Sequence, residues 1–96
     1  MTNPRAVWMD GRLVPWAKAQ VHVMSHSLHY GSGVFEGIRC YDTPKGPQIF
    51  RLHDHVDRLH RSARCMLMPP PYGEKETVRA IGEAARANRY KACFVN

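Results

Sequence analysis

The stretch that decides the fold of this chain runs from His26 to Tyr41 and reads HSLHYGSGVFEGIRCY. No helical or strand period fits all of it. Its glycines permit a sharp turn or the close approach of a ligand to the backbone. Tyr30 and Phe35 flank that backbone, and such aromatic residues serve equally well as the wall of a small-molecule pocket or as the core of a hairpin. The residues of the stretch leave these two interpretations open.

The segment before this stretch predicts a β-hairpin. Residues 7–9 and 12–14 are apolar-rich and are separated by Asp10 and Gly11. Asp-Gly supplies the positive φ angles that a type I′ turn requires. Residues 21–23, Val-His-Val, alternate between apolar and polar and predict a further short strand.

The segments after it predict more strands. Residues 34–41 and 48–51 are expected to be strands on either side of a turn, because residues 43–47 are rich in Pro and Gly. Residues 91–96 also have the composition of a strand, and the chain ends there without a following turn. We therefore expect the 96 residues to be the front piece of a longer protein, cut at its C-terminal end.

Two helices are predicted in the second half of the chain. The first has one apolar face at helical spacing and is stopped by the proline run at 69–71. Its apolar face consists of Leu52, Val56, Leu59 and Ala63. The second covers residues 75–88, with acidic residues at its start and Asn88 as its stop. The predicted fold class is α/β of the α+β kind, a small, mainly antiparallel sheet with two helices packed on it. It forms one domain over residues 6–96, preceded by a loose tail at 1–5.

Composition narrows the class of protein. The chain is 44% hydrophobic and 23% charged, as in globular domains, and its net charge of +6 favours an acidic partner. Its apolar runs are shorter than a membrane span, and its first residues do not resemble a signal peptide. The cysteines, which lack metal-like spacing, are interpreted as small apolar residues of the interior. We expect a cytoplasmic protein without a membrane partner.

Several kinds of site are disfavoured by spacing. The six histidines do not group as zinc ligands do, so no metal is expected. Asp54 and Asp57 argue against nucleic-acid binding by the first helix, and no recognition module is present. The Gly-Ser-Gly beginning at Gly31 continues into no nucleotide-binding loop. Arg58 flanks the apolar face and has the planar fork that suits a small phosphate, but on the residues alone it is interpreted as a surface arginine whose stem covers the core.

A specific pattern connects these segments. The motif HYG-x-x-VFEGIR at residues 29–39 is followed by F-R-x-x-x-H-x-x-R-L at residues 50–59. In this pattern, and from Trp8 onward without gaps, the chain resembles the N-terminal domain of branched-chain amino acid aminotransferases, which are pyridoxal phosphate enzymes of fold type IV. D-amino acid transaminase and aminodeoxychorismate lyase are the related alternatives. The sequences MSH-x-LHYG and RCY-D favour the branched-chain enzymes.

The resemblance assigns roles to individual residues. It implies that Arg58 binds the phosphate of the cofactor and that Phe35 and Gly37 line the pocket for the substrate side chain. It implies that Tyr30 reaches into the pocket of a neighbouring subunit, so that a homodimer or a higher homo-oligomer is expected. Phe94 stands at an aromatic pocket position where the family commonly has tyrosine.

Asn96 departs from the family pattern. Many members of the family have an arginine there, which receives the distal carboxylate of glutamate. The resemblance therefore puts the usual way of binding glutamate in doubt for this chain.

The resemblance also implies what these 96 residues lack. The four lysines, at 18, 45, 75 and 91, match no family position for the Schiff-base lysine, so we expect no catalytic residue here and no activity from this piece alone. The full-length enzyme is expected to exchange the amino group of Leu, Ile or Val with 2-oxoglutarate through pyridoxal 5′-phosphate. The alternative from another class is a non-catalytic binding or assembly module.

Overall fold

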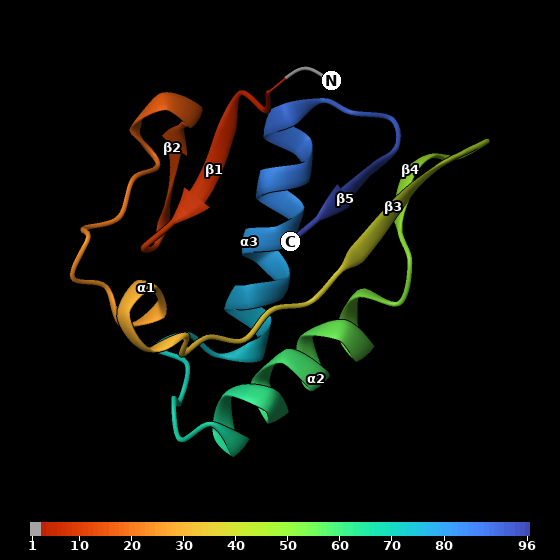
Figure 1. Cartoon of the computed structure of the whole chain (residues 1–96). Helices are drawn as coiled ribbons and strands as arrows, with labels where there is room; N and C mark the ends of the chain where they lie inside the picture. The colour runs from red at the N-terminus through yellow and green to blue at the C-terminus, as the bar shows by residue number, and fades with distance from the viewer. Residues whose placement is uncertain (1–2) are drawn as a thin grey trace.

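The computed structural model describes residues 3–96, which fold around the long helix α3 (Glu74–Asn88). In Figure 1 the hairpin of β1 (Ala6–Met9) and β2 (Arg12–Pro15) lies to one side of α3. A three-stranded antiparallel sheet lies to the other side, in the order β4-β3-β5. Helix α2 (Leu52–Cys65) packs against α3. The remaining elements are the 3-10 turn η1 (Trp16–Lys18), the short helix α1 (His26–Tyr30) and the strands β3 (Ile38–Thr43), β4 (Gly46–Ile49) and β5 (Cys93–Val95).

The predicted hairpin is confirmed. Asp10 and Gly11 both have positive φ angles, of 52° and 95°, as a type I′ turn requires. A side chain at Gly11 would place its Cβ 3.0 Å from the hydroxyl oxygen of Tyr72, whose ring packs edge-on against Trp8. Glycine is therefore needed at this turn for its conformation and for its lack of volume.

One asparagine fastens the hairpin to α3. The amide oxygen of Asn88 accepts hydrogen bonds from the backbone N–H groups of Arg5 and Ala6, at 2.6 and 3.1 Å. Its amide nitrogen donates to the carbonyl oxygens of Ala6 and Ala84, at 3.0 and 2.7 Å. The helix ends at Asn88 as predicted, because Arg89 takes the left-handed conformation with φ of 57°. In addition, Asn88 connects the two ends of the described chain.

Helix α2 supplies most of the buried core together with β3. The predicted apolar face is confirmed, since Val56 is 1% exposed and Ala63 is buried beside it. Ile38 and Cys40, alternate residues of β3, are buried as well, and Ala80 of α3 completes the core. Because residues alternate across a strand, Arg39 and Tyr41 point to the opposite, exposed face of the sheet.

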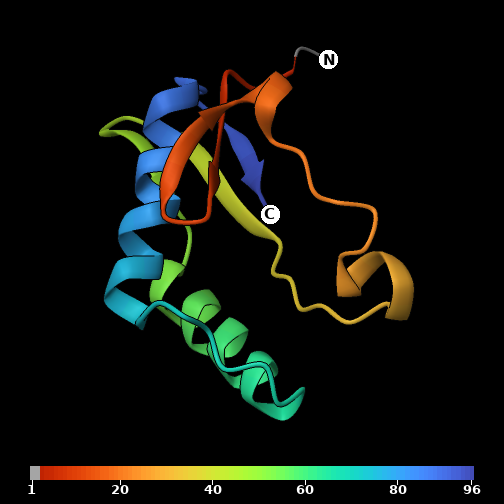
Figure 2. The same cartoon turned by 90° about the vertical axis from the view of Figure 1, so that its left-hand side faces the viewer.

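The strand predicted at residues 21–23 is wrong. The chain there makes a turn, in which the N–H of Ser25 donates to the carbonyl of His22 at 2.9 Å, and helix α1 follows. Val21 and Val23 are 63% and 68% exposed, so the alternating pattern has no sheet to join. Helix α1 ends at Gly31, which takes the left-handed conformation with φ of 67°. In Figure 2 this helix stands away from the other elements at the end of two long connections.

The other strand predictions are right in place but wrong in their limits. Strand β3 begins at Ile38, not at residue 34, because its pairing with β5 starts where Ile38 meets Val95. Strand β4 lies at residues 46–49, earlier than predicted, since it pairs with β3 directly after a tight turn. Pro47 is accommodated because β4 is an edge strand. Strand β5 covers only Cys93–Val95 of the predicted residues 91–96.

The predicted tail at 1–5 falls partly outside the described residues, which begin at Asn3; the N–H of Arg5 is bonded to Asn88. The prediction of buried cysteines holds for Cys40, but Cys93 is half-buried and Cys65 is exposed. Within residues 3–96, no helix is both long enough and apolar enough to cross a membrane.

Candidate functional site

The candidate site is built around Glu36, a buried carboxylate in the extended segment between α1 and β3. Its side chain is 7% exposed, and it lies two residues before Ile38, where the strand pairing begins. Glu36 and His60 are the two buried polar or charged residues in the described part of the chain. A buried carboxylate requires hydrogen-bond partners or an opposite charge, because its desolvation is costly.

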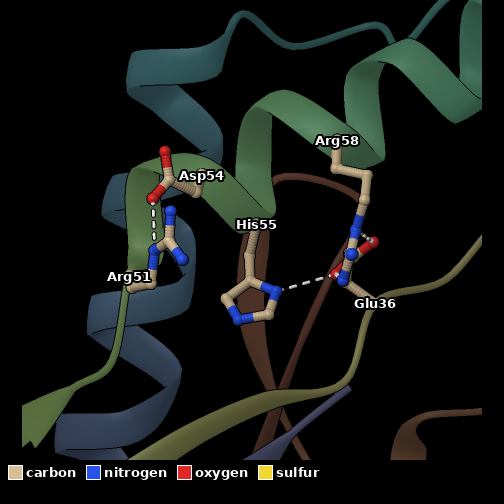
Figure 3. Close-up of polar contacts among 5 residues, drawn as sticks. All are labelled: Glu36, Arg51, Asp54, His55 and Arg58. Atoms are coloured by element: carbon tan, nitrogen blue, oxygen red, sulfur yellow. Dashed lines mark hydrogen bonds and ion pairs between the residues drawn. The ribbon is translucent and has the colours of Figure 1, made fainter.

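Helix α2 supplies those partners. His55 and Arg58 are separated by three residues and therefore lie on the same face of the helix. Figure 3 shows both side chains reaching from α2 toward Glu36. Arg51 and Asp54, at the start of the same helix, form a separate ion pair at 2.7 Å whose two side chains are exposed.

The contact between Arg58 and Glu36 is bidentate. The Nε–H of Arg58 donates to Oε2 of Glu36, and its Nη2 donates to Oε1, both at 2.7 Å. His55 contacts the same Oε1 through Nδ1 at 2.8 Å. Two parallel N–H donors on a planar guanidinium match the two oxygens of a carboxylate, which gives this kind of pair strength and a defined orientation.

These contacts keep the carboxylate ionised. The hydrogen bonds from Arg58, and then that from His55, lower the pKa of Glu36 from 4.5 to about 2, although its burial acts in the opposite direction. In return, the hydrogen bond and charge of Glu36 raise the pKa of Arg58. The cluster therefore pairs a buried anion with a permanently charged guanidinium at every pH near neutrality.

The outer part of Arg58 remains accessible. Its side chain is 60% exposed, whereas that of Glu36 is nearly buried. An arginine has five N–H donors, and Glu36 uses one on Nε and one on Nη2. The two donors on Nη1 and the second donor on Nη2 form another edge of the same planar group. That edge fits two oxygens of a phosphate group, which is the ligand that the family resemblance implies for Arg58.

A second set of side chains lies on the outer face of the three-stranded sheet. The guanidinium of Arg39 lies 4.4 Å from the centre of the Phe94 ring, and 5.7 Å from that of Tyr41. Arg39 and Phe94 are register partners on β3 and β5, so they share this face. Phe94, predicted as an aromatic pocket residue, is 62% exposed and stacks with a cation.

The other predicted pocket residues lie in the segment that joins α1 to β3. Phe35 is 82% exposed and Tyr30 is 75% exposed, and a side chain placed at Gly37 would meet open space. Tyr30 packs edge-on against His26 within α1. Phe35 and Gly37 flank Glu36 in the sequence, so the backbone that positions the carboxylate also presents these two residues.

A separate apolar hollow of about 950 Å³ lies over α3, between the hairpin and β5. It is lined by residues such as Trp8, Trp16, Ile81 and Phe94, and also by Asn96. None of its lining side chains carries a charge, and neither Glu36 nor Arg58 belongs to it. The hollow therefore offers area for packing, and the charged chemistry lies elsewhere.

The histidines do not assemble a metal site. Within residues 3–96 no three His, Cys, Asp or Glu side chains are grouped as ligands for a metal ion. His60 is buried and shares a hydrogen bond of 3.0 Å with the hydroxyl of Thr77 on α3. His55 contacts Glu36, and His26 packs on Tyr30. These three are thus occupied by structural contacts.

Sequence reasoning missed two members of the charged cluster and the cation on the sheet. Glu36 was considered only to exclude it as the acidic partner of the cofactor ring, and His55 and Arg39 were given no role. A signal was present, since Glu36 is a lone carboxylate beside the apolar residues Phe35 and Ile38, and His55 and Arg58 share a helical face. The pairing itself joins residues 22 positions apart, which no local pattern specifies.

Comparison with known proteins adds independent information. Residues 33–96 match the model of the family described as amino-transferase class IV. The chain is 49% identical over 89 residues to a branched-chain-amino-acid aminotransferase of Pseudomonas aeruginosa, covering 93% of this chain and 29% of that protein. It is 44% identical over 97 residues to the one of Escherichia coli K12, covering 99% and 31%.

Solved structures agree with these relatives. A branched-chain amino acid aminotransferase whose source is abbreviated T.th., complexed with N-(5′-phosphopyridoxyl)-L-glutamate, superposes with a TM-score of 0.94 at 46% identity, covering 98% of this chain and 32% of that chain. The enzyme of Thermoproteus uzoniensis with norvaline gives 0.89 at 45% identity, covering 96% and 31%. The expected fold, with its antiparallel sheet and packed helices, is thereby confirmed. The chain spans about 30% of the length of the relatives it matches.

Proposed function

Because this chain belongs to the class IV aminotransferase family, we propose that it is the N-terminal part of a branched-chain amino acid aminotransferase. The full-length protein moves the amino group between Leu, Ile or Val and 2-oxoglutarate, with pyridoxal 5′-phosphate as its cofactor. The names of the similar proteins support this substrate class, as does the bound phosphopyridoxyl compound of a structure at 46% identity.

The observation that carries the proposal is the geometry of Arg58. Its guanidinium is held on one edge by Glu36 and keeps N–H donors on an exposed edge. A phosphate group accepts two parallel N–H bonds from such an edge. Arg58 would hold the phosphate of the cofactor, and the cofactor ring, when bound, supplies a sink for the electrons released when the α-proton of the substrate leaves.

The other residues of the chain bind and orient. Phe35 and Gly37 extend from the segment that carries Glu36, and we assign them to the wall around the substrate side chain. Their exposure leaves them accessible to a substrate, and the absence of a side chain at Gly37 leaves room there. Phe94 adds an aromatic surface over Arg39. The lysine that abstracts and returns the proton is assigned to the part of the protein outside these 96 residues.

The segment around α1 suits a second subunit. Its large apolar side chains are more than 60% exposed: Val21, Val23, Met24, Leu28 and Tyr30. Exposed apolar side chains gathered in one segment indicate an interaction surface. We propose that this segment packs against another copy of the chain and that Tyr30 reaches the neighbouring site, in a homodimer or a larger homo-oligomer. We also assign the protein to the cytoplasm, in keeping with its three free thiols.

The test uses the full-length protein. Leucine-dependent consumption of 2-oxoglutarate, together with the absorbance of a bound pyridoxal cofactor, is the expected result. Arg58→Ala is expected to release the cofactor at least about 10-fold faster, since a charge-assisted hydrogen bond contributes roughly 1.5–3 kcal/mol.

Other outcomes identify the alternatives. Turnover with D-alanine but not with leucine would assign the protein to the D-amino acid transaminases, and conversion of aminodeoxychorismate would assign it to the lyases. A full-length protein that binds no pyridoxal phosphate would be a binding or assembly module. Unchanged cofactor retention in Arg58→Ala would remove Arg58 from the phosphate site.

A further inference from the structure

We propose that Glu36 is a positioning residue for the cofactor phosphate: together with His55 it holds Arg58 so that one edge of the guanidinium faces outward. This inference rests on the proposed function, because it requires Arg58 to bind that phosphate. It adds a role for two residues that never touch the phosphate themselves. The observation behind it is the meeting of one buried carboxylate with two side chains of α2.

The contacts select a single edge of the guanidinium. Glu36 binds the edge formed by Nε and Nη2, with both bonds at 2.7 Å. The edge formed by Nη1 and Nη2 is left with one donor on each nitrogen that points away from the carboxylate. The planar group cannot rotate about its own bonds without breaking one of the two contacts, so the direction of the outer edge is determined by Glu36.

Glu36 is itself well anchored. Its side chain is 7% exposed, and His55, 19% exposed, binds the oxygen that also accepts from Nη2 of Arg58. The backbone on its C-terminal side enters β3 at Ile38, which is 3% exposed. Arg58, in contrast, has a long side chain that is 60% exposed and would sample many rotamers without a partner. The buried anion therefore provides the rigid support, and the exposed cation receives its orientation.

An opposing effect has to be weighed. The negative charge of Glu36 repels a phosphate, so removing it could also strengthen phosphate binding. However, both oxygens of Glu36 are already engaged by N–H donors, and the guanidinium lies between them and its outer edge. We therefore expect the loss of orientation to exceed the relief of repulsion. The two effects give opposite signs for Glu36→Gln, which makes the proposal testable.

The experiment compares pyridoxal 5′-phosphate with pyridoxal, which lacks the phosphate. The dissociation constants of both are measured by titration of the full-length apoenzyme, for the wild type and for Glu36→Gln. Glu36→Gln is expected to weaken binding of the phosphorylated form about 10-fold, as expected when one immobilised side chain becomes mobile, and to leave pyridoxal within about 2-fold. A merely structural loss would weaken both compounds equally, so the ratio of the two constants isolates the orientation of Arg58.

The chain offers a matched control. Asp54→Asn removes a carboxylate from another arginine pair on α2, in which both side chains are exposed, and it should leave the ratio unchanged. Glu36→Asp keeps the charge on a shorter side chain and should give an intermediate ratio. It also serves if Glu36→Gln does not fold. In an Arg58→Ala background, Glu36→Gln should change the ratio no further, because its effect passes through Arg58.

The outcomes separate this inference from the proposed function. If Arg58→Ala lowers the discrimination between the two compounds but Glu36→Gln and Glu36→Asp do not, the positioning role is overturned and the phosphate site stands. A higher discrimination in Glu36→Gln also overturns it, since repulsion then dominates. If Arg58→Ala itself leaves the discrimination unchanged, the assignment of Arg58 to the phosphate fails, and the positioning role fails with it.

Discussion

The lowered pKa of Glu36 predicts a specific loss of stability in acid. A carboxyl whose pKa in the folded state lies below its unfolded value stabilises the protein fully above the unfolded pKa and loses this contribution as the pH falls toward the folded pKa. For Glu36 the window runs from about 4.5 down to about 2. The side chain is buried, so the full difference corresponds to about 3 kcal/mol at roughly 1.36 kcal/mol per pKa unit. By pH 3, about 2 kcal/mol of it should be lost.

Glu36→Gln removes this titration. We expect the free energy of unfolding of the wild type to fall about 2 kcal/mol more steeply between pH 6 and pH 3 than that of the variant. Urea unfolding followed by circular dichroism, at half-unit steps of pH, gives the two profiles. The variant should be less stable at pH 6, because Arg58 and His55 lose their acceptor, and the difference should shrink in acid. Parallel profiles would show that the carboxyl is not held ionised by its partners, and the reasoning about the cluster would then be refuted.

Three further predictions concern other parts of the chain. Asn88→Ala removes four hydrogen bonds between α3 and the hairpin and should lower the free energy of unfolding by about 2 kcal/mol, with faster hydrogen exchange at residues 6–9; unchanged exchange there would contradict the docking role. Tyr30→Ala should weaken self-association in sedimentation velocity without changing the circular dichroism spectrum, because the ring is 75% exposed, whereas Tyr30→Phe should associate normally. Asn96→Arg should lower the KM for 2-oxoglutarate about 5-fold or more and leave that for leucine unchanged, since a guanidinium binds a distal carboxylate; an equal change in both would exclude selective recognition.

The sheet illustrates where sequence patterns stop being informative. Residues 21–23 alternate as a strand does, yet they form an exposed turn. Residues 34–37 continue the predicted strand but, within the described chain, lie outside the pairing that starts at Ile38. A strand exists only where a partner satisfies its backbone groups, and that partner, β5, is more than fifty residues away in the sequence. Alternation therefore indicates which residues can form strands, and pairing selects those that do.

The sequence by itself determined the features that depend on neighbouring residues. The apolar spacing from Leu52 to Ala63 specifies a helix with one buried face, because the helical period is local. Asp10 and Gly11 specify the hairpin turn, because the required φ angles are properties of those two residues. The motif shared with a known family singled out Arg58 as a phosphate ligand before any contact was visible.

Only the tertiary structure decided what surrounds Arg58. The bidentate contact with Glu36 joins residues 22 positions apart, and it forms because the packing of β3 and α2 around Val56 places a buried carboxylate beside one face of the helix. The same packing lowers the pKa of that carboxyl and gives the guanidinium a direction. Burial and ion pairing depend on which distant segments come together, so the local sequence names the charged residues but leaves their partners to the fold.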